Sequence, residues 1–425
     1  MSNEIKPNDA DFDIALLAKK ARKASLQAAQ LDTNTKNTLL LAMAENIKAE
    51  QASILRENAK DISAGEEKGL SSAMLDRLLL NPERINGIAS AITEIANLAD
   101  PVGIVSPTSK RPSGIEVAKM RIPLGVIAMI YEARPNVTAE AAALCLKSGN
   151  GVILRGGSEA LHSNLAIAKV LHQTLVDFKL LPEVISVVPN PDRSVIEKLL
   201  TLNQDIDLVI PRGGEGLIRY VSDNSRIPVI QHFKGVCHLY VDKYADVDKA
   251  IGILVNGKTQ RPSACNSLET VLVHQDVSSA FLTKAAIALA PFKVKIHACA
   301  NSIQYFEGAE LATDTDYDAE YLAQEIAVKE VSSFETAIAH IQQFSSDHTE
   351  VIITQDYSRS REFVRRINSS VVMVNASSRF SDGGELGLGS EIGISTSKLH
   401  AYGPMGLEAL TSEKFVVFGE GETRS

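Results

Sequence analysis

Short apolar runs alternate with amphipathic segments through the middle of the chain, and this alternation constrains the fold more than any other feature. Each run has the length of a buried strand, and the segments between runs have the helical spacing of apolar residues. Strand–helix–strand units of this kind build a parallel sheet with helices on its faces. The expected strands are 125–131, 151–157, 184–189 and 207–214, and the expected helices are 138–149, 159–175 and 193–200.

The same alternation begins again after 238–250 and predicts a second α/β domain. The first hundred residues show helical periodicity instead, with helix starts expected at Asp32 and Ser71. Between these regions 113–132 is extended in character, and we predict a projecting ribbon that runs into a buried strand. In the second domain the expected strands are 269–274, 292–299, 325–331, 350–355 and 370–378, with helices at 333–344 and 358–368.

Polar and glycine-rich turns follow the expected strands of the first α/β domain. They read YEARPN, LRGGSE, VPNPD and PRGGEG. Because ligands of a parallel sheet bind at the carboxyl ends of its strands, these turns predict a crevice for a phosphate-bearing ligand. A further glycine-rich stretch, 381–395, is expected to be either a loop that lines a cleft or a plain surface loop.

Composition excludes several classes of protein. A formal net charge of −9 argues against a general affinity for nucleic acids or acidic membranes, because both require clustered Lys and Arg. Only four cysteines occur, without a C-x-x-C pair, which disfavours a disulfide framework and a cysteine-based zinc site. The N-terminus lacks a signal-peptide pattern, and no apolar run approaches the ~18 residues of a membrane span. We therefore predict a cytoplasmic protein.

The stretch GILVNGKT at 252–259 matches the spelling of a phosphate-binding loop. Such a loop needs a strand before it and a helix that starts at the lysine. Here the residues before Lys258 have helical spacing instead, and Pro262 would lie in the first turns of the required helix. The dinucleotide fingerprint G-x-G-x-x-G is also missing. A nucleotide would have to be held another way, and the Gly-Gly pairs at 156–157 and 213–214 are either turns that allow this or ordinary turns.

Metal and serine-hydrolase chemistry have no local sequence signal. The nine histidines show no H-E-x-x-H or other compact ligand spacing, so we predict no catalytic metal. His232 and His238 flank Cys237 but are six residues apart, and we interpret them as polar or core histidines. No G-x-S-x-G motif occurs.

Cys265 differs from the other cysteines in its surroundings. Cys145 lies in the apolar run AAALCLK and is interpreted as a buried residue. Cys265 precedes an expected strand amid polar residues, and Lys258 and Arg261 upstream would favour the thiolate, which is the form that attacks carbonyl carbon. On these residues alone, Cys265 is either a nucleophile or an ordinary thiol.

Three features together resemble the aldehyde dehydrogenase superfamily: the asparagine of ARPN after a strand, the Gly-Gly turns, and the cysteine after TQRPSA. The longer motifs YEARPNVT, LRGGSEA, PRGGEGLI, TQRPSACN and GPMGLEALT resemble more closely its members that reduce an acyl phosphate. The resemblance implies two α/β domains with Rossmann-like parallel sheets plus a small oligomerisation β-ribbon. The implied ranges are 1–108 and 125–240 for the cofactor-binding domain, 241–408 for the catalytic domain, and 109–124 with 409–425 for the ribbon.

Site residues follow from the resemblance position by position. Cys265 takes the place of the superfamily nucleophile, and Asn136 that of the side-chain donor to the oxyanion, which the Cys265 backbone amide would complete. Arg155 falls near the adenosine ribose, and Glu215 beside the dinucleotide phosphates. The residues expected to hold the cofactor are Arg155, Ser158, Gly213, Gly214, Glu215 and Glu325, and those expected to grip the substrate are Arg134, Lys234 and Arg261.

Two departures from the superfamily pattern are informative. Ser158 stands where NAD-preferring members carry a carboxylate, which suits NADP, although Glu159 is adjacent. His232 stands where hydrolytic members carry the Glu that activates water. An enzyme with an acyl-phosphate substrate does not need that water, because hydrolysis would waste its acyl-enzyme.

The resemblance implies NADPH-dependent reduction of L-glutamyl 5-phosphate to L-glutamate 5-semialdehyde and phosphate through a cysteine thioester, the second step of proline biosynthesis. It also implies functional coupling to glutamate 5-kinase. The ribbon at 113–124 and the C-terminal strand KFVVFG are expected to pair between subunits in a dimer or tetramer.

Alternatives stay open at this point. Within the superfamily they are another acyl-phosphate reductase and a hydrolytic aldehyde dehydrogenase. From other classes they are an ATP-dependent phosphotransferase that uses GILVNGKT and a non-catalytic dinucleotide-binding regulator.

Overall fold

The computed structural model describes residues 12–424, which form two compact units. The first eleven residues, part of the N-terminal segment in which we predict no signal peptide, lie outside the described residues. Within the described part, no helix is long and apolar enough to cross a membrane. The first unit comprises the described residues up to Gln231 together with 388–393 and those from Met405 on, and the second comprises 232–387 and 394–404.

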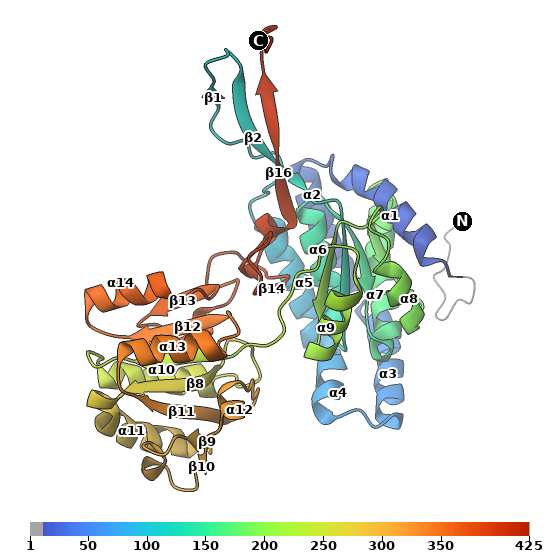
Figure 1. Ribbon diagram of the computed structural model, residues 1–425. Helices are drawn as coiled ribbons and strands as arrows, with labels where there is room; N and C mark the ends of the chain where they lie inside the picture. Colours follow the sequence, from blue (N-terminus) through green and yellow to red (C-terminus); the bar gives the residue numbers. More distant parts are fainter. Residues whose placement is uncertain (1–11, 425) are drawn as a thin grey trace. The chain divides into compact units, whose positions relative to one another are not determined.

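The first unit begins with helices and then alternates strands with helices (Figure 1). The predicted helix starts are confirmed, because the Asp32 and Ser71 side chains accept the amides of Thr35 and Met74 as N-caps. Its elements are α1 (Ile14–Ala28), α2 (Thr33–Ala49), α3 (Gln51–Glu67), α4 (Ser72–Leu78), α5 (Pro82–Asn97), β1 (Ser109–Lys110), β2 (Glu116–Pro123), β3 (Val126–Tyr131), α6 (Pro135–Lys147), β4 (Gly151–Arg155), η1 (Ser158–Ala160), α7 (Leu161–Asp177), η2 (Pro182–Val184), β5 (Ile185–Val187), α8 (Arg193–Leu199), β6 (Leu208–Arg212), α9 (Glu215–Asn224), η6 (Leu407–Leu410) and β16 (Thr411–Phe418).

A four-stranded parallel sheet of order β5-β4-β3-β6 forms the centre of this unit. All six residues of β3 are buried, as expected for a strand covered on both faces. Each of the four strands lies inside a run predicted as a strand, and α6, α7 and α8 occupy the predicted helices. Gly149, the predicted end of α6, has a φ of +76°, which a residue with a side chain rarely adopts.

A separate antiparallel sheet of order β1-β2-β16 forms the ribbon. β16 pairs with β2 along its whole length, from Thr411 opposite Pro123 to Phe418 opposite Glu116. The two segments thus pair with each other inside one chain, and the expectation that they also pair between subunits stays a prediction. A further two-stranded sheet consists of β14 (Gly393–Ser395) and β15 (Gly403–Met405).

The second unit contains a seven-stranded parallel sheet of order β10-β9-β11-β8-β7-β12-β13. Its elements are β7 (Cys237–Val241), α10 (Val247–Thr259), β8 (Leu268–His274), α11 (Gln275–Leu289), η3 (Ala290–Phe292), β9 (Lys295–Ala298), η4 (Ile303–Tyr305), β10 (Glu310–Leu311), α12 (Asp314–Tyr317), β11 (Glu325–Val331), α13 (Phe334–Phe344), β12 (Thr349–Ile353), α14 (Tyr357–Arg366), β13 (Val371–Val374) and η5 (Ser378–Phe380).

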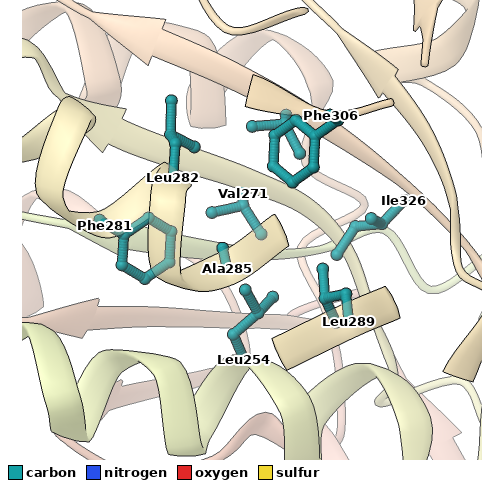
Figure 2. Close-up of a pocket in the computed structure, with 9 residues that line it drawn as sticks. Leu254, Val271, Phe281, Leu282, Ala285, Leu289, Phe306 and Ile326 are labelled. Carbon is teal, nitrogen blue, oxygen red and sulfur yellow. The ribbon is translucent and has the colours of Figure 1, made fainter. Parts of the chain in front are cut away.

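Helices cover both faces of this sheet. Successive strand residues point to opposite sides, so each strand contributes side chains to two cores. In β7, Leu239 and Val241 pack in the core with α10 and α11, whereas Tyr240 packs in a second core with α13 and α14. Figure 2 shows part of the first core, where the lining side chains are all aliphatic or aromatic. This apolar region supports the sheet and offers no group for chemistry.

Candidate active site

Cys265 lies in the turn between α10 and β8 and is partly buried. Two contacts hold its backbone. The Cys237 thiol donates to the Cys265 carbonyl oxygen at 3.3 Å, and Gly235 packs so closely that a Cβ there would lie 2.2 Å from the same oxygen. The position of the thiol-bearing turn therefore depends on a glycine that sequence reasoning did not single out.

Two histidines adjoin the Cys265 thiol. One ligand-capable atom each from His232, Cys265 and His348 lie within 4.8 Å of one another. Burial lowers the pKa of His232 to about 4, and burial together with repulsion from His232 lowers the pKa of His348 to about 3. Both imidazoles are therefore neutral at pH 7. His348 was missed from the sequence, because it lies far along the chain from Cys265.

Lys258 is buried and is not a solvent-exposed cation beside Cys265. Its ammonium group lies 2.7 Å from the Glu269 carboxylate and 2.9 Å from the Leu268 carbonyl oxygen, and the Lys258 and Glu269 side chains are fully buried. The expectation that Lys258 favours the Cys265 thiolate is weakened, because its charge is committed to Glu269. GILVNGKT lies within α10, so the phosphate-binding loop that the spelling suggests is absent.

Positive charge near Cys265 comes from two arginines. Arg261 is exposed four residues before the cysteine, and its role there stays a prediction. Burial and the nearby Arg261 lower the pKa of Arg379, while Cys265 opposes that shift. Arg379 also donates to Gln260 at 2.9 Å, at the end of α10. Sequence reasoning missed Arg379, because no local pattern distinguishes it in NASSRF.

Lys234, a candidate for substrate binding, is already engaged. Its ammonium group lies 2.6 Å from an Asp318 carboxylate oxygen and 3.0 Å from the Asp318 backbone oxygen. An anionic substrate would have to compete with this carboxylate, so Arg261 is the better candidate of the two.

Asn136 and Arg134 lie at the start of α6 in the first unit. Arg134 is the N-cap residue, and Asn136 follows in the first turn, partly buried. The Asn136 side-chain nitrogen donates to Glu140 at 3.1 Å, which fixes the direction of its amide. Cys265 belongs to the second unit, and the cooperation of the two residues stays a prediction.

Arg155 ends β4 and is 9% exposed. It donates one bond to the Pro191 carbonyl oxygen, while its Nε has no partner among the described residues. Ser158 is exposed at the start of η1. The adjacent Glu159 carboxylate accepts the Ala133 amide at 2.6 Å, so it is already committed to the backbone.

Gly213 and Gly214 precede α9, with Gly214 as its N-cap. The Glu132 carboxylate accepts the Gly214 amide at 3.3 Å, and a Cβ at Gly213 would lie 2.7 Å from the Glu132 Cδ atom. Glu215 pairs with Arg219 one turn later, at 2.5 Å. The glycines thus allow another group to approach the backbone closely. The Gly214 amide, which could donate to a phosphate, donates to the Glu132 carboxylate in this structure.

Glu325 begins β11 in the second unit. Its carboxylate lies 2.5 Å from His297 Nε2 and 3.3 Å from the Lys295 ammonium group. Burial acts to raise the pKa of Glu325, but the bonds from His297 and Lys295 outweigh burial, and the net pKa is lowered. The carboxylate is therefore ionised, and its role in binding the cofactor stays a prediction.

Comparison with known proteins decides the family. The family model described as "Aldehyde dehydrogenase family" matches residues 5–303. The chain is 70% identical to gamma-glutamyl phosphate reductase of Colwellia psychrerythraea over 97% of the chain and 99% of that protein. The chain belongs to the aldehyde dehydrogenase family. The gamma-glutamyl phosphate reductase of Idiomarina loihiensis is 60% identical, with 96% of this chain and 98% of that protein covered.

A solved structure confirms the fold class of this aldehyde dehydrogenase family member. The crystal structure of gamma-glutamyl phosphate reductase from Thermotoga maritima matches with a TM-score of 0.95 and 41% identity, covering 97% of this chain and all of the other. The predicted aldehyde dehydrogenase-like α/β fold is thus confirmed. Enzymes of the family use a nicotinamide cofactor, and the unpartnered Nε of the buried Arg155 is suited to such an anionic ligand.

Proposed function

We infer that the chain is a gamma-glutamyl phosphate reductase, which reduces L-glutamyl 5-phosphate to L-glutamate 5-semialdehyde in proline biosynthesis. The observation that carries this inference is 70% identity over nearly the full length of a protein of that name. The cysteine in its turn beside two arginines is consistent with covalent catalysis on an anionic acyl donor.

The cofactor is proposed to be NADP(H), held by Arg155, Ser158, the Gly213–Gly214 turn and Glu325. Ser158 is exposed and uncharged, so it does not repel a 2′-phosphate. The Glu159 carboxylate accepts the Ala133 amide at 2.6 Å but keeps its negative charge, so the proposed preference for NADP rests on Ser158. When bound, NADPH supplies the hydride that the reduction requires.

Cys265 is the proposed nucleophile. Its thiolate attacks the acyl carbon, and the carbonyl oxygen becomes negative while the carbon–sulfur bond forms. The Asn136 amide and the Cys265 backbone N–H are proposed to donate to that oxygen, and loss of one such donor typically costs ~10²- to 10³-fold in rate. The bond from the acyl carbon to the phosphate oxygen then breaks, phosphate leaves, and the thioester on Cys265 remains.

Reduction of the thioester releases the aldehyde. After hydride reaches the thioester carbon, the same two donors stabilise the second oxyanion. Its collapse breaks the carbon–sulfur bond and returns Cys265 as the thiolate. The chain therefore needs no group that activates water, which fits the presence of His232 where hydrolytic members carry Glu.

Arg261 and Arg379 are proposed to bind the phosphate group. Both are positive and interact with each other near Cys265, and two like charges held together are stabilised by an anion. Arg134 remains a candidate for the substrate carboxylate. Lys234 is the weaker candidate, because Asp318 neutralises it.

Semialdehyde oxidation, followed by nicotinamide absorbance, tests this function in the reverse direction. Wild type should require both inorganic phosphate and NADP. Cys265→Ser should abolish turnover, whereas Cys299→Ser should not, because Cys299 lies on another strand end and contacts Ser302. Asn136→Ala should lower kcat by ~10²- to 10³-fold, and Arg379→Ala should raise the KM for phosphate.

Two results would contradict the proposal. A turnover rate that is the same with and without inorganic phosphate would indicate a hydrolytic aldehyde dehydrogenase. NADP(H) binding without any turnover would indicate a dinucleotide-binding regulator. The buried Lys258 already disfavours the phosphotransferase, which needs that lysine at a nucleotide phosphate.

The chain is further proposed to form a homo-oligomer through the β1-β2-β16 sheet. Phe415, Val417 and Phe418 lie close together on the edge strand β16 and are 70%, 54% and 61% exposed, so this edge offers apolar side chains to another chain. A sizing measurement that finds only monomer would contradict this proposal. A cytoplasmic location and coupling to glutamate 5-kinase, the source of the acyl phosphate, also remain predictions.

A further inference from the structure

The three groups at the Cys265 thiol form a ligand set that the sequence does not reveal. His232 precedes β7, Cys265 precedes β8, and His348 precedes β12, so neighbouring strands of one sheet bring them together. Their nearest ligand atoms lie within 4.8 Å of one another. All three residues belong to the second unit, whose internal geometry is defined by its own sheet.

The proton on His348 can be placed from its neighbours. Its Nδ1 lies 2.7 Å from the Thr349 hydroxyl oxygen, and that hydroxyl donates its own hydrogen to Ser381 at 2.7 Å. The Thr349 oxygen is therefore an acceptor toward His348, and Nδ1 carries the ring hydrogen. Nε2 then presents a lone pair, and this fully buried nitrogen has no hydrogen-bond partner in residues 12–424.

His232 adds a second unsatisfied imidazole. Its Nδ1 is buried and likewise has no hydrogen-bond partner in the described chain. The rings of His232 and His348 have centroids 5.1 Å apart and are tilted by 49°, so they do not stack. Buried polar nitrogens without partners are rare and commonly indicate a bound ligand or a functional role.

We propose that His232, Cys265 and His348 bind a zinc-class divalent cation, and that this cation reversibly blocks the Cys265 thiol. Zinc binds Cys thiolates and His nitrogens, and three protein ligands leave a fourth tetrahedral position for water. Binding releases the thiol proton to solvent and forms a metal–sulfur bond, without oxidation or reduction. Mg²⁺ and Ca²⁺ are not expected to bind at this site, because both ions prefer oxygen ligands.

The surroundings support a ligand role for His348. Metal-bound histidines usually donate the other ring N–H to a neighbour, which fixes the tautomer and the ring orientation. Thr349 and Ser381 supply that arrangement here without any metal. The cation is an inhibitor and has no part in the reaction.

Co²⁺ titration of the chelator-treated full chain tests the site, without substrate or cofactor. A thiolate-to-cobalt charge-transfer band should appear in wild type and in Cys299→Ser, and it should be lost in Cys265→Ser. His232→Gln and His348→Gln should each weaken binding by at least about 10-fold, since even an outer partner contributes that much. Thr349→Val keeps all three ligands and should weaken binding by about 10- to 100-fold.

A second measurement needs no variant. Saturating Zn²⁺ should slow alkylation of Cys265 by iodoacetamide at least about 10-fold in wild type, while alkylation of Cys299 should be unchanged. No cobalt–thiolate band in wild type, a band that survives Cys265→Ser, or full affinity in both histidine variants would overturn the proposal. These readouts do not depend on turnover, so failure of the cation site and failure of the proposed reductase activity are distinguishable.

Discussion

Removal of Lys258 should destabilise the second unit strongly. Its ammonium group and the Glu269 carboxylate are 2.7 Å apart, both side chains are 0% exposed, and Lys258 also donates to the Leu268 carbonyl oxygen. Lys258→Met would leave a buried carboxylate and a buried carbonyl oxygen without that donor. Loss of one member of a buried pair costs about 3–5 kcal/mol, so the free energy of unfolding should fall by that amount.

A matched variant on the same helix supplies the control for Lys258→Met. Lys249 pairs with Asp246 at 3.5 Å, but its side chain is 65% exposed, so Lys249→Met should change stability by less than about 1 kcal/mol. Replacing both buried partners, Lys258→Met with Glu269→Leu, should recover most of the loss, because two apolar groups leave no buried charge.

Urea unfolding followed by far-UV circular dichroism measures these differences, because the chain contains no Trp for fluorescence. The reasoning is refuted if Lys258→Met is as stable as Lys249→Met. It is also refuted if the double variant is as unstable as Lys258→Met.

Two further predictions follow from close contacts in the second unit. Gly235→Ala should displace the Cys265 turn and lower the rates of both turnover and Cys265 alkylation, because the added Cβ would lie 2.2 Å from the Cys265 carbonyl oxygen. Gly252→Ala, where nothing lies within 4 Å, should leave both rates unchanged and stabilise α10 by about 0.5–1 kcal/mol; equal alkylation rates in the two variants would contradict this. Burial, with repulsion from His238 and Lys329, lowers the pKa of His340 to about 2. The contribution of His340 to the free energy of unfolding is therefore complete above pH 6.5 and is lost as pH falls, because the unfolded chain then binds a proton that the folded chain does not. Wild type should therefore lose about 2 kcal/mol more than His340→Gln between pH 7 and pH 5 in urea unfolding, and equal losses would contradict the assignment.

Local pattern was enough to predict most elements of the two sheets. Strands such as β3 and β4 are apolar over their whole length because helices cover both faces, and this burial is visible as a run in the sequence. Asp32 and Ser71 begin helices because their side chains cap the first turn, which is also a local effect. The pairing of β16 with β2 inside one chain was not predicted, because the partner of an edge strand depends on distant segments.

The candidate site was predictable only in part. Cys265 and Arg261 lie in one short polar turn with a distinctive spelling, so both were found. His348 and Arg379 come from distant segments with no local motif, and only the strand order β8-β7-β12 of the folded sheet brings His348 to the cysteine. Lys258 was misjudged for a related reason. Its burial against Glu269 is a tertiary property that the helical pattern of α10 does not encode.

Burial of His232 affects both the proposed reaction and the proposed cation site. A general base works best when its pKa lies near the operating pH, and burial lowers the pKa of His232 to about 4, some three units below neutrality. In the proposed mechanism, His232 is therefore only a weak base toward water beside the thioester on Cys265, so hydrolysis is slow and the thioester is reduced by hydride instead. A neutral imidazole is also the form that binds metal ions, so the same lack of positive charge on His232 suits the proposed zinc-class cation at Cys265.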